Sequence, residues 1–144
     1  MKKPVLVHVQ SIQRNPDGEE LKLELVAEGK FYTKDQTQYI VYEESELTDM
    51  KGVTTVIKVL PDETIMLLRL GNVHQRQEYR KGKVTKSAYE TPVGIIDVTM
   101  KTYECAVDLT EDGIGSIRLG YDVDLAGFGA NYTQLTINVQ EDNA

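Results

Sequence analysis

The sequence predicts a small all-β protein, folded as a single antiparallel up-and-down β-barrel of about eight to ten strands over residues 1–144. Three observations support this fold class. Apolar and polar residues alternate with a period of two in several segments, turn signals divide the chain into pieces of strand length, and no window shows a convincing helical repeat. Consecutive hairpins without a long crossover favour a barrel over a sandwich.

The alternation identifies the strands in order along the chain. It begins with Val5, Val7 and Val9 and returns over residues 21–25. It is most regular over residues 117–125, where every second residue is apolar or aromatic, and it repeats over 135–139. Such a period places one set of side chains on one face of a pleated strand, so each segment is expected to bury a single face.

Turn signals separate these strands. The run Asn15-Pro16-Asp17-Gly18 supplies a preset φ at proline and a positive φ at glycine, as a hairpin loop requires. Gly71-Asn72 is predicted to form a two-residue hairpin turn. Residues 43–51 are the one segment expected to form a turn or two of helix, before Gly52. Further signals occur at Pro61-Asp62, Lys81-Gly82, Pro92 with Gly94, Asp112-Gly113 and residues 127–131.

Composition excludes several functional classes. The chain carries 23 acidic and 16 basic residues, a formal net charge of −7, which disfavours nucleic acid and anionic membranes as partners. The single cysteine, Cys105, cannot form an intramolecular disulfide, and no stretch reaches the roughly 20 apolar residues of a membrane helix. We therefore expect a cytoplasmic protein, with residues 141–144 frayed at the end of the domain.

Two motifs in the second half of the chain carry a family resemblance. They are Arg69-x-Gly71, followed by Arg76, and Tyr89-x-Thr91-Pro92-x-Gly94, followed by Tyr121, Val123 and Leu125. In combination they resemble the YwiB-like family of small bacterial proteins. The resemblance implies a lipocalin-like (calycin-type) barrel, a cytoplasmic Gram-positive source and no assigned activity or site residues. The sequence departs from the family pattern at His74 and Tyr79, where apolar residues are expected.

The predicted turn at 71–72 would place Arg69 opposite His74 and put Arg76 on the same face. Facing inward, these side chains would converge in a low-dielectric interior and could bind a carboxylate or phosphate. Facing outward, they would be solvated surface charges, which the cost of burying unpaired charge favours. Tyr89 and Tyr121 could line the same pocket or pack at the barrel wall. Arg69, His74, Arg76, Tyr89 and Tyr121 are therefore the candidate ligand-binding residues.

No catalytic, metal or cofactor motif emerges. Residues 108–113 match the opening of a calcium loop, but Leu119 occupies the position of the bidentate glutamate, so an Asp-Gly hairpin turn is expected instead. Neither the histidines nor Cys105 has zinc-ligand spacing. No nucleophile, base and oxyanion donor can be assembled, so enzyme activity is the least supported class, although residues distant in sequence can build a hydrolytic site.

Two functional hypotheses follow. In the first, the barrel binds a small apolar or anionic amphipathic molecule in its interior. In the second, the interior is solid and the protein acts through its surface, as a homodimer or partner-binding module that uses any uncapped edge strand. An enclosed void above about 300 Å³ with arginine at its mouth would favour the first strongly.

Overall fold

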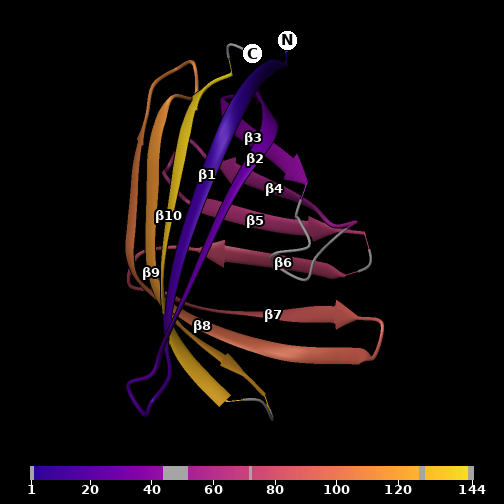
Figure 1. The fold of residues 1–144 in the computed structure, drawn as a ribbon, viewed down its shortest axis with the longest axis vertical. Helices are drawn as coiled ribbons and strands as arrows, with labels where there is room; N and C mark the ends of the chain where they lie inside the picture. The colour runs from indigo at the N-terminus through magenta and orange to yellow at the C-terminus, as the bar shows by residue number, and fades with distance from the viewer. Residues whose placement is uncertain (1, 44–51, 72, 127–128, 143–144) are drawn as a thin grey trace.

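The computed structural model describes residues 2–43, 52–71, 73–126 and 129–142. Over those residues the chain forms ten strands and no helix, and the strands close into one antiparallel barrel (Figure 1). The predicted fold class is confirmed. The strands in chain order are β1 Lys3–Arg14, β2 Glu20–Lys34, β3 Thr37–Glu43, β4 Thr54–Val59, β5 Ile65–Leu70, β6 His74–Tyr79, β7 Val84–Thr91, β8 Gly94–Leu109, β9 Gly115–Leu125 and β10 Gly129–Glu141.

The first and last strands close the barrel. Each strand pairs with its neighbours in sequence, and β1 pairs with β10 along almost its whole length, with Val7 opposite Val139. Lys3 Nζ lies 3.0 Å from Glu141 Oε1, and the start of β1 lies beside the end of β10 in Figure 1. Glu141, expected in a frayed tail, is thus the last paired residue of β10.

The period of two in the sequence becomes an inward and an outward face. Along β9, the predicted apolar face, from Ile117 through Leu119 to Tyr121, points inward, whereas Arg118 and Asp122 are exposed. Each buried aliphatic side chain of this kind contributes about 1.5–3 kcal/mol relative to an exposed one. The buried core residues are Val5, Val7, Leu25, Phe31, Ile40, Tyr42, Ile57, Val59, Ile65, Leu67, Tyr79, Val98, Met100, Ile117, Leu119, Ile137 and Val139.

Two predicted turns form as hairpins. Asn15 Oδ1 accepts hydrogen bonds from the backbone N–H groups of Asp17 and Glu19 in the β1–β2 turn. Residues 108–113, which match the opening of a calcium loop, lead into the β8–β9 turn, in which Gly113 donates its N–H to Thr110 O at 2.9 Å. Gly113 has a φ of +80°, and a Cβ there would collide with the Phe31 ring, so only glycine lets this turn pack against the barrel.

The β5–β6 connection is one residue longer than the predicted two-residue turn at 71–72. It spans residues 71–73, so Arg69 lies opposite Gln75 and not opposite His74. The predicted pairing is therefore wrong. Because side chains alternate between faces along a strand, a shift of one residue moves each β6 side chain to the face opposite the predicted one.

The helical turn expected over residues 43–51 falls almost entirely on 44–51, outside the described residues. In the part of the chain that the structure describes, no helix has the length and apolar character needed to cross a membrane.

Candidate functional site

The inner face of β6 is polar, unlike most of the barrel interior. Gln75, Gln77 and Tyr79 all point inward and are buried at 7%, 6% and 1% exposure. The Tyr79 hydroxyl donates a 2.7 Å hydrogen bond to Gln77 Oε1, which satisfies both groups away from water. This strand places a row of hydrogen-bonding groups inside the barrel.

A second tyrosine, from β9, meets this row across the interior. The rings of Tyr79 and Tyr121 pack edge to face, with centroids 4.9 Å apart. Burial, together with the neighbouring Tyr121, raises the pKa of Tyr79 well above its usual value. Burial likewise raises the pKa of Tyr121, partly offset by hydrogen bonding to Tyr79 and by the positive charge of Arg69. Both hydroxyls are therefore neutral near pH 7 and keep their protons, of which that of Tyr79 is donated to Gln77.

Arg69, near the end of β5, provides the only charged group in this cluster among the described residues. Its Nη1 donates a hydrogen bond to Gln75 Oε1 at 2.5 Å, across the β5–β6 ladder. Its Nε is buried and has no hydrogen-bond partner in the part of the chain described. The guanidinium is always protonated, so this position holds a positive charge with an unused donor.

The cluster borders a cavity of about 150 Å³. Arg69, Tyr121 and Leu67 lie along it, and Ser11 and Leu23 contribute from the β1–β2 hairpin. Its volume is below the roughly 300 Å³ at which ordinary ligand pockets begin. The full lining is Val9, Ser11, Gln13, Leu23, Glu24, Leu25, Tyr42, Leu67, Arg69, Tyr121 and Leu135.

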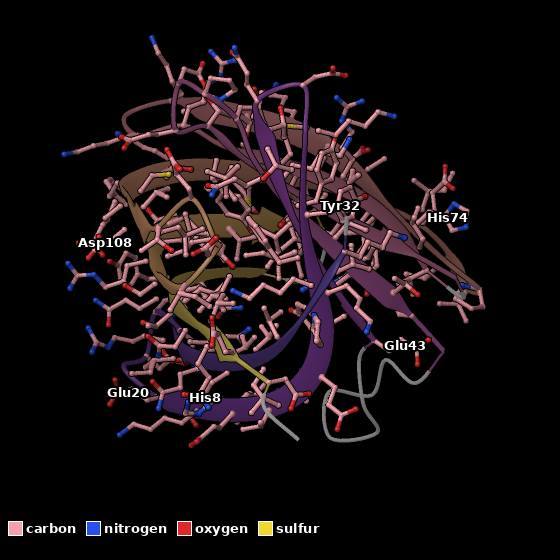
Figure 2. All side chains as sticks on the ribbon, turned by 90° about the horizontal axis from the view of Figure 1, so that it is seen from above. His8, Glu20, Tyr32, Glu43, His74 and Asp108 are labelled. Carbon is pink, nitrogen blue, oxygen red and sulfur yellow. The ribbon has the colours of Figure 1, made fainter. Side chains whose placement is uncertain are left out.

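The structure brings together some of the five candidate residues and separates others. Arg69 and Tyr121 border the cavity, and Tyr89 is half-buried and packs against the core without lining it. His74 and Arg76 are exposed on the outer face, and Figure 2 shows His74 pointing away from the barrel interior. The predicted common face of Arg69, His74 and Arg76 is therefore wrong, because the longer β5–β6 connection turns the last two outward.

Gln75 and Gln77 were not predicted as interior residues. The six residues of β6 read His-Gln-Arg-Gln-Glu-Tyr, so no apolar alternation indicates which face is buried. The sequence also left open whether Tyr89 and Tyr121 line the interior or pack at the wall. Only the register of β6 against β5 could have shown which β6 side chains point inward, and that register depends on a single residue in the connecting loop.

The described residues contain no group of three or more histidine, cysteine, aspartate or glutamate side chains placed to hold a metal ion. Cys105 is half-buried, and its desolvation raises the pKa of the thiol, which disfavours the reactive thiolate. The acidic pair Asp122 and Asp124 is exposed on the outer face of β9, where Asp122 Oδ2 accepts a 2.6 Å hydrogen bond from Tyr103.

These features define a closed ten-stranded barrel with one polar, positively charged corner in an otherwise apolar interior. The chain belongs to the family described as "Domain of unknown function (DUF1934)", whose model matches residues 7–137. It is similar to the ywiB protein from Bacillus subtilis, known from a crystal structure, with 24% identity, 99% coverage of this chain, 94% coverage of that chain and a TM-score of 0.81. The resemblance to YwiB-like proteins is thereby confirmed, and that structural similarity establishes the fold alone. No curated protein matches the sequence.

Proposed function

We propose that this protein binds a small molecule with a carboxylate or phosphate group inside the barrel, anchored by Arg69. The observation that carries the proposal is the buried Nε of Arg69, which has no hydrogen-bond partner within the described residues. A guanidinium presents its donors in a planar fork that matches the oxygens of a carboxylate or phosphate. A bound anion would use the free donor and neutralise the charge.

Electrostatics support an anion over a neutral ligand. Arg69 is partly buried, and withdrawing a positive charge from water costs free energy unless an opposite charge compensates it. Gln75 supplies only a neutral oxygen. Glu24, the one acidic residue along the cavity among those described, has its carboxylate hydrogen-bonded to His8 Nε2 at 2.6 Å on the outer face. The Tyr121 hydroxyl adds a second donor beside the guanidinium.

Cavity size limits the ligand. A volume of about 150 Å³ is the volume that roughly five water molecules occupy in liquid water. It accommodates an anionic group with a few carbon atoms. A longer apolar chain would leave past Leu23, which is 37% exposed at the rim. A short carboxylic acid or acyl phosphate therefore fits better than an enclosed long-chain fatty acid.

Small closed barrels can hold one small ligand in their interior, and a cytoplasmic location would supply small acids of this kind. The proposal assigns no role to His74 or Arg76, since both lie on the outer face. Tyr89 packs against the core and lies opposite Gln75, the partner of Arg69, which makes it a positioning residue in this scheme.

Thermal unfolding with added ligand tests the proposal. We expect short carboxylic acids or acyl phosphates to raise the Tm of the wild-type protein and to appear as 1:1 complexes in native mass spectrometry. Arg69→Met should abolish this shift, whereas Arg76→Met, on the outer face of the same hairpin, should retain it. Without ligand, Arg69→Met should lower the free energy of unfolding by about 1 kcal/mol, because it leaves the buried Gln75 Oε1 without its donor. The absence of any ligand shift, or an equal loss in both variants, would contradict the proposal.

A further inference from the structure

One edge of β2 is only partly covered by its neighbour β3 in the part of the chain that the structure describes. β2 pairs with β1 over residues 20–31, but its pairing with β3 covers only residues 29–34. Within the described residues, the second edge of β2 over residues 20–28 has no ladder partner. In Figure 1, this part of β2 runs beyond the shorter strand β3. Free strand edges of this length are templates for pairing with another chain.

This free edge also exposes apolar side chains. Leu21 is 54% exposed and Val26 is 62% exposed, on opposite faces of the strand. Alternating with the leucines are Glu20, Lys22 and Glu24, all exposed. Charges on an edge strand usually block pairing, so the question is whether any arrangement brings opposite charges together.

We propose that a second copy of this chain pairs with the free edge of β2, antiparallel and two-fold symmetric, with Leu23 at the centre. In this register Lys22 of each copy lies directly opposite Glu24 of the other, and Leu21 lies opposite Leu25. The two neighbouring symmetric registers place Lys22 opposite itself or Glu24 opposite itself, and like charges directly across a ladder are destabilising. Registers centred on Leu21 or Leu25 would also pair opposite charges, Lys22 with Glu20 or with Glu28. The first aligns only residues 20–22 of the free edge, and the second brings the partner strand against Glu43 at the end of β3. Charge complementarity and the length of the free edge together therefore select the register centred on Leu23.

The dimer would adjoin the interior site without depending on it. Leu23, Glu24 and Leu25 are consecutive, and all three line the cavity. Because their side chains alternate between faces, the backbone edge of β2 must itself form part of the cavity wall. A second copy on this edge would lie along that wall and place its own Leu23 beside the rim. The pairing would form whether or not an anion binds to Arg69.

Charge reversal with rescue tests the register. We expect wild-type protein to show concentration-dependent dimerisation in sedimentation velocity. Lys22→Glu and Glu24→Lys should each weaken the dimer about tenfold, because each turns two attractive pairs into repulsive ones. The double variant should restore it, even though it still lacks the His8–Glu24 pair. Lys30→Glu, with the same charge change where β3 covers the edge, is the matched control.

Cross-linking tests the two-fold centre directly. In a Cys105→Ser background, Leu23→Cys should form a disulfide-linked dimer on oxidation, since residue 23 faces its own copy within disulfide reach. Val26→Cys, displaced from the axis, should not. A wild-type monomer at all concentrations, single reversals that leave the dimer unchanged, or equal cross-linking at both positions would each overturn the inference. Ligand binding by a monomeric protein would leave the proposed function intact while removing this one.

Discussion

Strands β1 and β6 show opposite ways of facing the same barrel interior. β1 pairs along most of its length with both β2 and β10, and Val5 and Val7 on its inner face are fully buried. β6 pairs with β5, but its pairing with β7 is confined to His74 and Gln75. Its inner face carries two glutamines and a tyrosine. The β1 side of the interior is lined by apolar side chains, whereas the β6 side is lined by hydrogen-bonding groups.

This contrast indicates where stability and function reside. Apolar burial on the β1 and β10 side contributes without directional requirements. The β6 side stabilises the fold only if its hydrogen bonds are made, because buried polar groups without partners cost free energy. The unused donor of Arg69 lies against this polar wall, and the proposed role in recognition rests on that observation.

The largest effect on the free energy of unfolding is expected from a substitution on the apolar side of the interior. Ile137 of β10 is 1% exposed and faces the core next to β1. Ile137→Ala should lower the free energy of unfolding by about 2–5 kcal/mol, through lost burial and the cavity left behind. Urea denaturation followed by far-ultraviolet dichroism measures the change. A loss below about 1 kcal/mol would show that this wall is not the main source of stability.

A smaller effect is expected on the polar side. Tyr79→Phe removes the donor to Gln77 and should cost about 1–2 kcal/mol near neutral pH. The pKa of Tyr79 is raised in the folded state, so the unfolded chain releases its proton first and wild-type stability falls as pH rises above about 10. The difference between wild type and variant should therefore shrink in alkali. Urea titrations at neutral and alkaline pH measure it, and a difference that grows with pH would refute the buried, neutral hydroxyl.

The smallest effects on the free energy of unfolding are expected on the outer face of β6, and they test which β6 side chains point inward. His74→Ala and Arg76→Ala should each change the free energy of unfolding by no more than about 0.5 kcal/mol, because both side chains are exposed on the outer face. Neither should alter binding of small carboxylates. Gln75→Ala, one residue away on the inner face, should be more costly because it leaves Arg69 without its partner. Equal effects at all three positions would mean that the strand faces are misassigned.

The fold was predictable because its signal is repeated many times. Period-two alternation along β1, β9 and β10 indicated which face is buried, and proline and glycine marked the turns between strands. No single segment decided the outcome. Closure was predictable from consecutive hairpins without crossovers, although the pairing of β1 with β10 is a property of the whole chain.

The site was only partly predictable, for the opposite reason. Arg69 and Tyr121 were identified, but the orientation of β6 depended on one residue in the connection at 71–73. A strand whose six residues are all polar or aromatic carries no alternation that could correct such an error. The inward orientation of Gln75 and Gln77 was therefore not predicted, whereas His74 and Arg76 were placed on the face of Arg69. The site could not be fully predicted because β6 is polar on both faces, and not because its residues are distant along the chain.

The ion pair between Lys3 and Glu141 joins positions 138 residues apart, at the seam where the barrel closes. Loop closure over such a separation costs entropy before its contacts are made, and folding rates fall as the mean sequence separation of contacts rises. A growing chain on the ribosome cannot complete this seam until β10 has emerged. Folding should therefore be slow and late, and the nascent protein should depend on chaperones more than a helical bundle of equal length.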